Sequence, residues 1–186
     1  MVGKCQIKSL AKIILVILAY MDIITGMKIG VLSDTHLKGY DNKLKEIAEG
    51  PFRDAKVIMH AGDIVEEGVL DAFGVKDVYA VRGNMDSASL RNALPEKRVV
   101  EILGLKIGLM HGWGEPFAIE KRILNEFSDI DCLVYGHTHR AVNRVKNGLL
   151  IFNPGSAAGP TLTGINSVGI LEIDNNKIWG RIINLD

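Results

Sequence analysis

Residues 29–36 read Ile-Gly-Val-Leu-Ser-Asp-Thr-His, a short apolar run followed by an aspartate and a histidine. The same order recurs twice, because the run 57–60 leads to Asp63 and the run 133–135 leads to His137 and His139. Short runs of this kind are typical of buried strands, and α/β proteins build their sites where such strands end. The repeated pattern therefore predicts an α/β protein with a metal site at its strand ends.

Two further blocks, Gly83-Asn84 and His111-Gly112, continue the series. The complete set of predicted ligands is Asp34, His36, Asp63, Asn84, His111, His137 and His139. Oxygen and imidazole ligands without sulfur favour manganese, iron, zinc or nickel over calcium or copper(I). Seven ligands are too many for one catalytic ion and suit two ions about 3.5 to 4 Å apart, an arrangement used for in-line displacement at phosphorus. Two divalent ions outweigh two carboxylates and a bridging hydroxide, so the site should attract phosphate.

Alternating strands and helices are expected from Met27 onward, in the order βαβαβ. The expected elements of this first part are strands 27–33, 57–60 and 77–81, a helix 42–49 and a helical turn 68–73. A hairpin 97–103 and 105–110 around Gly104, a helix 115–127 and a strand 131–135 follow. The last third, with strands 141–146, 149–152, 167–173 and 177–184, indicates a second, largely antiparallel sheet. The predicted fold is a two-sheet β-sandwich flanked by helices, with four layers in the order αββα.

Composition limits the classes of protein that need to be considered. The chain has 186 residues, 47% hydrophobic and 24% charged, which indicates one ordinary globular domain. Lys and Arg number 22 and so do Asp and Glu, so a protein that binds extended duplex nucleic acid is disfavoured. The two cysteines, Cys5 and Cys132, lie far apart and predict no disulfide framework, and Cys132 is expected in the core.

Residues 1–26 differ from the rest and are treated as an N-terminal extension to a domain of residues 27–186. Lysines precede an apolar run that Asp22 ends, and this run is too short to span a membrane. We favour an upstream extension, because Met27 begins a strand directly; export or membrane targeting and a docked amphipathic helix are the alternatives. A cytoplasmic protein without a membrane partner is expected, and the sequence does not indicate an oligomeric state.

The blocks DxH, GD, GN, HG and GHTH, in this order, resemble those of the calcineurin-like metallophosphoesterase family. The resemblance extends from Met27 to the end of the chain, and five blocks in order are far more specific than any one alone. It implies that Asp34, His36 and His139 hold one metal ion, that Asp63 bridges, and that Asn84, His111 and His137 hold the other. The segment 153–156, Asn-Pro-Gly-Ser, is a further block of this kind; it is either a tight turn facing the metal loops or a plain hairpin connector.

One position departs from the family pattern. Many members carry a histidine directly after the asparagine of the GN block, and this chain has Met85 there. A thioether cannot donate a proton, so the general-acid contribution, roughly 10² to 10⁴ in rate, would be missing or supplied by water. Such an enzyme should favour good leaving groups. In this respect the chain resembles the small bacterial and archaeal phosphodiesterase branch of the family.

The function expected from these observations is a dinuclear metal-dependent phosphodiesterase in which a metal-activated hydroxide attacks phosphorus in line. Asp63, Asn84 and His111 are the expected catalytic residues. The expected cofactor is a pair of divalent ions, Mn²⁺ in the first place and otherwise Ni²⁺, Zn²⁺, iron or Mg²⁺, and the expected partner is a small phosphodiester. The alternatives are a nucleotide pyrophosphatase or phosphomonoesterase on the same site, or a non-catalytic protein-binding scaffold of this fold.

Several residues near the blocks have two possible roles each. His60 is expected to pack or to support the ligands rather than to bind metal. A second group could orient loops or contact substrate, or else serve packing and surface salt bridges: Ser33, Thr35, Arg82, Trp113, Glu115, Thr138 and Arg140.

Overall fold

The structure is a computed structural model that describes residues 26–39, 41–161 and 164–185. The predictions for Cys5 and for nearly all of the extension 1–26 therefore lie outside the described residues. No helix in the described ranges is long and apolar enough to cross a membrane.

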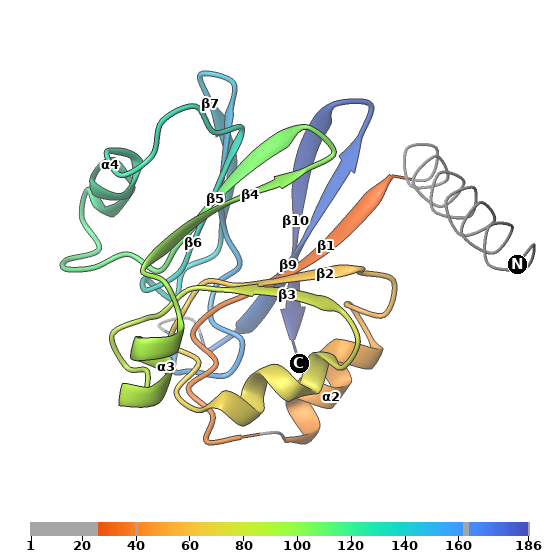
Figure 1. Ribbon diagram of the computed structural model, residues 1–186, viewed down its shortest axis with the longest axis vertical. Helices are drawn as coiled ribbons and strands as arrows, with labels where there is room; N and C mark the ends of the chain where they lie inside the picture. Colours follow the sequence, from red (N-terminus) through yellow and green to blue (C-terminus); the bar gives the residue numbers. More distant parts are fainter. Residues whose placement is uncertain (1–25, 40, 162–163, 186) are drawn as a thin grey trace, which may run out of the picture.

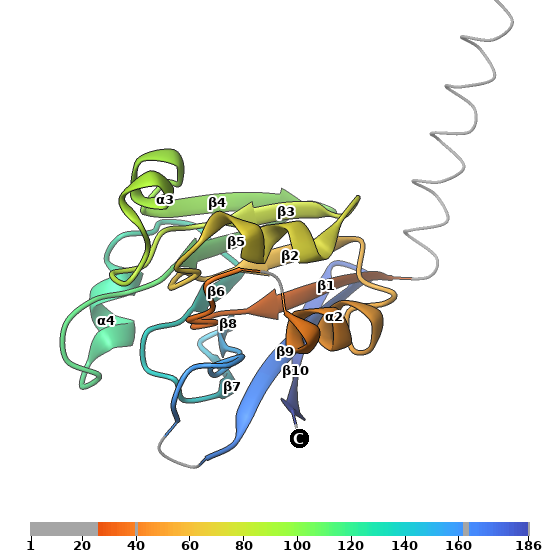
Figure 2. The same ribbon diagram turned by 90° about the horizontal axis from the view of Figure 1, so that it is seen from below.

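The first sheet has the strand order β10-β9-β1-β2-β3. Its strands are β1 (Met27–Leu32), β2 (Val57–His60), β3 (Asp77–Ala80), β9 (Asn166–Asp174) and β10 (Lys177–Leu185). The three strands β1, β2 and β3 are parallel, and β9 runs antiparallel to both of its neighbours. A turned view shows β9 and β10 beside β1, on the side away from β2 and β3 (Figure 2).

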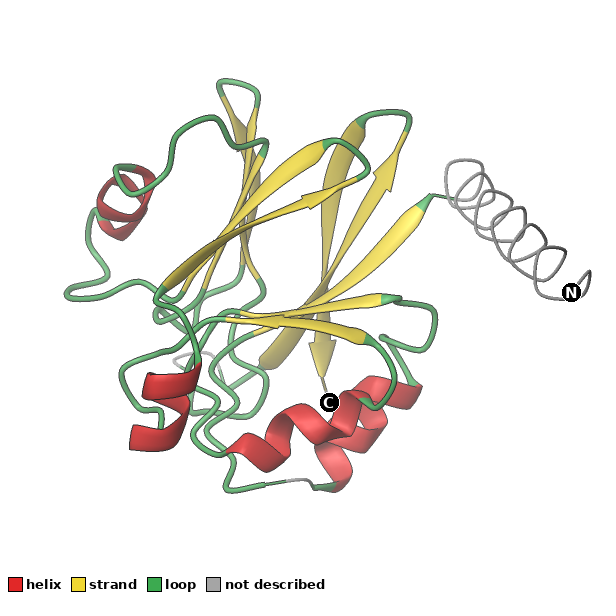
Figure 3. Cartoon of the chain, viewed as in Figure 1, coloured by secondary structure: helices red, strands yellow, loops and turns green. Residues whose placement is uncertain are grey.

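The second sheet has the order β4-β5-β6-β8-β7. Its strands are β4 (Lys97–Ile102), β5 (Leu105–Met110), β6 (Cys132–Tyr135), β7 (Val142–Lys146) and β8 (Leu149–Asn153). The central strands β5, β6 and β8 are parallel, and each edge strand is antiparallel to its neighbour. Both sheets are therefore mixed, and the predicted two-sheet sandwich flanked by helices is confirmed (Figures 1 and 3).

The expected division of the strands between the sheets was wrong. The C-terminal strands do not form a sheet of their own, because β9 and β10 extend the first sheet while β7 and β8 complete the second. Strand β9 pairs with the free edge of β1 over Met27–Val31 and so satisfies backbone groups that would otherwise form an open sheet edge. An alternating pattern identifies a strand and its buried face, but it does not identify the neighbour with which the strand pairs.

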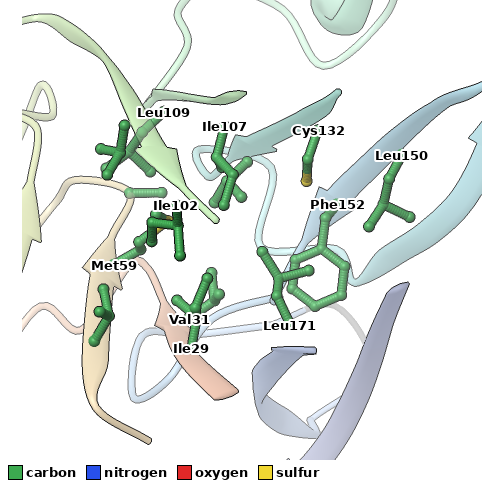
Figure 4. Packing of buried hydrophobic residues seen from close by; sticks show 14 of the residues in the cluster. Ile29, Val31, Met59, Ile102, Ile107, Leu109, Cys132, Leu150, Phe152 and Leu171 are labelled. Atoms are coloured by element: carbon green, nitrogen blue, oxygen red, sulfur yellow. The ribbon is translucent and has the colours of Figure 1, made fainter. Parts of the chain in front are cut away.

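The space between the sheets is filled by a continuous apolar cluster (Figure 4). Phe152 of β8 is fully buried and lies beside Leu171 of β9. A Cβ atom added at Gly169 or Gly180, on β9 and β10, would lie 2.4 Å from the Phe152 ring. The two glycines therefore make room for a ring from the opposite sheet. Cys132 is buried in the same cluster, as the sequence indicated.

Helices cover the outer faces of the sandwich (Figure 3). Helix α2 (Asn42–Glu49) and the 3₁₀ helix η1 (Glu67–Phe73) pack through Leu44, Ile47 and Val69 on the first sheet. The Asp41 carboxylate caps α2 by accepting a hydrogen bond from the Leu44 N–H at 3.0 Å. Helix α4 (Ile119–Leu124) packs on the second sheet through Ile119 and Ile123. The predicted helix 42–49 and the helical turn at 68–73 are both confirmed.

One predicted helix is shorter than expected, and one helix was not predicted. The helix expected at 115–127 is only α4 (Ile119–Leu124), because Pro116 and a left-handed Ala118, with φ of 56°, delay its start. Helix α3 (Ala88–Ala93) was not predicted. Its six residues are too few to show a helical period, although Ser87 is a recognisable N-cap whose side chain accepts a hydrogen bond from the Leu90 N–H.

Replacing Phe152 tests the contact between the sheets. We expect Phe152→Ala to lower the free energy of unfolding by about 3 to 5 kcal/mol, because the ring leaves a cavity between two sheets that cannot close fully. Urea denaturation measures this, with Val145→Ala on the exposed part of β7 as the control. A loss of less than about 1 kcal/mol, no larger than for a surface substitution, would contradict the packing of Phe152 between the two sheets.

Candidate metal centre

All seven predicted ligands lie in loops that follow the carboxyl ends of strands. Three of these loops follow strands of the first sheet, β1, β2 and β3, and two follow β5 and β6 of the second. The loops converge at one end of the sandwich (Figure 1). The side chains form a continuous series of contacts, in the order His139, Asp34, His36, Asp63, His111, Asn84 and His137.

Asp34, His36 and His139 form the first cluster, one of the groups whose geometry could hold a metal ion. The Nε2 atoms of His36 and His139 lie 3.3 Å apart. Asp34 Oδ1 lies 3.2 Å from the His139 Nε2 and 4.0 Å from the His36 Nε2. This oxygen is buried and accepts no well-formed hydrogen bond. A buried carboxylate oxygen without a hydrogen-bond donor is costly, and a bound cation would remove that cost.

Asp63, Asn84, His111 and His137 form the second cluster. Asn84 Oδ1 lies 3.2 Å from the Nε2 atom of His111 and 3.1 Å from the Nδ1 atom of His137. Asp63 Oδ2 lies 3.4 Å from the His111 Nε2 and 3.8 Å from the His36 Nε2 of the first cluster. Ligand atoms that surround one ion at about 2.1 Å are themselves about 3 Å apart, so these spacings suit a common ion in each cluster.

The second ring nitrogen of three of these histidines faces a backbone carbonyl. His111 Nδ1 lies 2.7 Å from the Ala61 oxygen, His137 Nε2 2.8 Å from the Gly114 oxygen, and His139 Nδ1 2.5 Å from the Pro160 oxygen. Each of these nitrogens carries the hydrogen that it donates, so the other nitrogen can turn a lone pair toward the cluster. This is the arrangement that fixes a histidine as a neutral metal ligand.

The backbone at the ligands is unusual. Five of the seven predicted ligands have positive φ, namely Asp34 at 53°, His36 at 50°, Asp63 at 54°, His137 at 68° and His139 at 54°. The left-handed region costs of the order of 1 to 3 kcal/mol for such residues and persists only where the surroundings enforce it. Their concentration at one place indicates that the loops are shaped for the direction of these side chains.

The glycines of the sequence blocks have a steric explanation. A Cβ atom at Gly83 would lie 2.2 Å from the Asp63 Oδ1, and one at Gly136 would lie 2.8 Å from the Ala61 oxygen and 3.0 Å from the Asp34 Oδ2. Gly83 thus lets two loops of the first sheet meet, and Gly136 lets a loop of the second sheet meet loops of the first, at distances that only glycine allows. In the blocks GN and GH a predicted ligand follows a glycine directly. Gly83 leaves room for Asp63, and Gly136 leaves room for Asp34.

The electrostatics of the clusters favour positive charge. The Asp34 carboxylate beside His139 raises the pKa of that imidazole to about 9. Burial lowers the pKa of His111, but the adjacent Asp63 and the charge of Asp34 outweigh burial and raise it. Burial works against ionisation of Asp63, yet His111 and the Met85 N–H hold its pKa below the usual value. A site that stabilises imidazolium in this way also favours a metal cation, which competes with those protons.

The segment 153–156 faces the metal loops, which decides between its two predicted roles. Ser156 Oγ donates to the Asp34 carbonyl at 2.9 Å, and Asn153 Nδ2 donates to the Gly136 carbonyl at 3.0 Å. Ser33 Oγ donates to the Gly155 carbonyl at 2.8 Å. The segment therefore holds the loops after β1 and β6 together, and Ser33 orients a loop as expected.

Asp86 supports the site and was missed in the sequence. Its side chain is buried, and its two oxygens accept hydrogen bonds from the Val65 N–H at 2.8 Å and the Gly83 N–H at 2.6 Å. It thus ties the loop of Asp63 to the loop of Asn84. The available signal was an acidic residue two positions after the GN asparagine.

The remaining candidates have separate roles. His60 is fully buried with Nε2 3.2 Å from the Thr35 Oγ1, and burial lowers its pKa to about 3, so it is a neutral supporting residue. Arg82 forms a surface salt bridge with Glu96 at 3.2 Å. Trp113 is 41% exposed and lines a cavity of 170 Å³ beside Asn84 and His111. Met85 exposes 57% of its surface, while its N–H donates to the Asp63 Oδ1 at 2.8 Å.

The chain matches a known protein family over most of its length. The sequence-family model that describes the calcineurin-like phosphoesterase superfamily domain matches residues 27–176. A relative from Methanothermobacter thermautotrophicus, named "Probable metallophosphoesterase", is 36% identical over 160 residues, which cover 84% of this chain and 92% of that protein.

Two solved structures share the fold. An archaeal phosphodiesterase is 29% identical, with a TM-score of 0.67 over 86% of this chain and 100% of its own. Vacuolar Protein Sorting 29 from Cryptosporidium parvum has a TM-score of 0.66 at 24% identity, over 87% of this chain and 98% of its own. The likeness to the second protein concerns the fold alone.

Arg122 of α4 holds the loop that orients His137. Its guanidinium donates to the carbonyls of Phe117 at 2.8 Å and Trp113 at 2.9 Å, and also to that of Glu115. Gly114, which accepts the hydrogen bond from the His137 imidazole, lies between two of these residues. The planar guanidinium, with donors in a fixed fork, suits several carbonyls at once in a way that a lysine cannot match.

Arg122→Ala should therefore weaken metal binding in the second cluster more than in the first. We expect the affinity for one Mn²⁺ ion to fall by roughly 10- to 100-fold, the usual effect of removing a residue that orients a ligand, while the affinity for the other changes little. Isothermal titration calorimetry of the metal-free protein measures this, with Lys121→Ala on the same helix as control. An unchanged titration in a folded variant would show that the loop holds its shape without Arg122.

Proposed function

The chain belongs to the calcineurin-like phosphoesterase superfamily, and from this starting point we propose that it is a dinuclear metal-dependent phosphodiesterase. The observation that carries the proposal is the position of the Asp63 Oδ2 atom, 3.4 Å from an imidazole nitrogen of one cluster and 3.8 Å from one of the other. One carboxylate oxygen that faces two sets of ligands is suited to bridge two ions.

In this proposal Asp34, His36 and His139 hold one ion, and Asn84, His111 and His137 hold the other, with Asp63 shared. Manganese is the first candidate, and the oxygen and imidazole ligands also suit nickel, zinc, iron or magnesium. When bound, two such ions supply a nucleophile at neutral pH, by lowering the pKa of water, and positive charge for the phosphate oxygens.

The side chains contribute position and charge rather than acid–base chemistry. Carbonyl groups fix the nitrogen that His111, His137 and His139 present, and the Met85 N–H fixes one oxygen of Asp63. At position 85 the thioether can neither donate a proton nor carry charge. Esters that leave as stable anions should therefore be the best substrates, which favours diesters with good leaving groups.

A non-catalytic scaffold is the second candidate, because the fold is shared with Vacuolar Protein Sorting 29. What favours the enzyme is that all seven predicted positions carry residues able to bind metal and that the structure brings them together. Left-handed backbone at five of them is a stability cost that a scaffold has no evident need to retain.

The test is metal-dependent hydrolysis of bis-p-nitrophenyl phosphate by the purified protein, with p-nitrophenyl phosphate as the monoester. We expect cleavage of the diester well above the monoester with Mn²⁺, and a loss of roughly 10³-fold in kcat for Asp63→Ala. The variant should also bind fewer Mn²⁺ ions per chain in calorimetry. Asp71→Ala, at an exposed aspartate of η1, is the control.

Near-normal turnover by Asp63→Ala would rule out the bridging role. Cleavage of the monoester alone would favour a phosphomonoesterase on the same site. A folded protein that is inactive with Mn²⁺, Ni²⁺, Zn²⁺ and Mg²⁺ would favour the scaffold.

Met85→His tests the missing general acid. The imidazole should raise kcat for esters with poor leaving groups, by up to roughly 10²-fold, and have little effect on p-nitrophenyl esters, which leave without protonation. A series of phenyl phosphodiesters with leaving groups of increasing pKa measures this as a shallower dependence of rate on that pKa. Met85→Leu is the control, and an equal effect across the series would contradict the idea.

A further inference from the structure

A cavity of 880 Å³ lies between α4 and β7, on the outer side of the second sheet. It is much larger than the 170 Å³ cavity beside Asn84 and His111, and its size is that of a site for a small organic ligand. Figure 3 shows α4 and the hairpin of β7 and β8 at the same end of the molecule. None of the seven predicted metal ligands lines this cavity.

Both walls of the cavity begin at the metal loops. Thr138 and Arg140 line one wall, and they alternate along the chain with His137 and His139. Pro116 and Phe117 line the other, and they follow Gly114, whose carbonyl accepts the hydrogen bond from His137. Consecutive Cα atoms are about 3.8 Å apart, so the Cα atom of Arg140 lies next to that of His139, which is a predicted ligand of the first cluster. A molecule bound at the centre could therefore extend into the cavity.

The cavity carries unbalanced positive charge. Three cationic residues line it, Lys121, Arg140 and Lys146, and within the described part of the chain no side chain forms an ion pair or hydrogen bond with theirs. The acid in the lining, Glu120, accepts a hydrogen bond from the Tyr135 hydroxyl at 3.0 Å and is paired with Arg144. Acidic and basic residues balance in the chain as a whole, so this excess is local. An anion is the ligand that it favours.

The same cavity has an apolar part. Phe117, which is 88% exposed, lines it together with Leu124, Tyr135 and Val142. Exposed aromatic rings beside cationic side chains are the combination that binds nucleobases and their phosphates. Binding of an inorganic anion would not require the apolar part of the cavity.

We propose that this cavity binds the far half of the substrate, a nucleotide that carries a phosphate in addition to the one attacked. The proposal rests on the phosphodiesterase function proposed above. The reaction remains a hydrolysis, in which one phosphorus–oxygen bond breaks, an ester bond in a diester or an anhydride bond in a diphosphate. Water supplies the new oxygen on phosphorus, and its protons are shared between the two products. The substrate class is thus a small nucleotide diester or diphosphate, with the base on Phe117 and the second phosphate on Arg140 and Lys146.

The test compares substrates with and without the second phosphate in the variant Arg140→Ala/Lys146→Ala. The probes are bis-p-nitrophenyl phosphate, a dithymidine dinucleotide with and without a 5′-phosphate, and a dithymidine diphosphate. We expect KM for the 5′-phosphorylated dinucleotide to rise about tenfold or more, the effect of losing a charge-assisted hydrogen bond. The kcat for this substrate, and both constants for bis-p-nitrophenyl phosphate, should stay within about twofold.

A matched control removes two exposed lysines elsewhere, in the variant Lys45→Ala/Lys177→Ala, and should leave all constants unchanged. Phe117→Ala should raise KM for both dinucleotides but leave that for bis-p-nitrophenyl phosphate unchanged. The wild-type protein distinguishes the two substrate classes. A higher kcat/KM for the phosphorylated dinucleotide indicates a diester, and a higher kcat/KM for the diphosphate-linked compound indicates a diphosphate.

The outcomes separate the two proposals. If the wild-type protein hydrolyses bis-p-nitrophenyl phosphate but the double variant handles the phosphorylated dinucleotide normally, the cavity proposal is wrong and the phosphodiesterase stands. The cavity proposal is also wrong if the nucleotides are neither cleaved nor inhibitory, or if the double variant loses activity equally on every substrate. Absence of hydrolysis of bis-p-nitrophenyl phosphate by the wild-type protein would instead overturn the proposed function.

Discussion

Two buried carboxylates, Asp34 and Asp63, are the constraint on which the rest of the site depends. Burying a charge without a partner costs far more than one hydrogen bond returns, so these groups need positive charge close by. The imidazoles meet part of that need, as the raised pKa of His111 and His139 indicates. Asp34 Oδ1 is buried without a well-formed hydrogen bond, so a cation bound beside this oxygen would stabilise the site.

The strand directions in the two sheets bring the side chains of the predicted ligands together. Parallel strands in both sheets deliver their carboxyl ends to the same end of the molecule, and the glycines at 83 and 136 allow the loops to approach within van der Waals contact. Left-handed backbone at five of the seven predicted ligands then directs their side chains. The apolar cluster between the sheets, with Phe152 against two glycines, supplies the rigidity that maintains this costly arrangement.

A second layer of contacts fixes the side chains of the predicted ligands. Asp86 joins two loops, the segment 153–156 joins two others, and Arg122 holds the loop whose carbonyl orients His137. Backbone carbonyls choose the ring nitrogen that three histidines present. The residues that form these contacts are of types common in ordinary loops. Their supporting role is therefore visible from their positions in the folded chain and not from residue type.

The fold class and the family can be predicted from the amino-acid sequence, because the predicted ligands at strand ends and their glycines are neighbours along the chain and leave a local pattern. The folded chain was needed to show that β9 and β10 extend the sheet of β1, and that Asp86 and Arg122 support the loops of the predicted ligands. It also shows that Arg140 lines a cationic cavity, whereas Arg82 pairs with Glu96. These features join residues far apart in the chain. Alternation of apolar residues specifies which face of a strand is buried, but the partner across the space is chosen by packing of the whole domain.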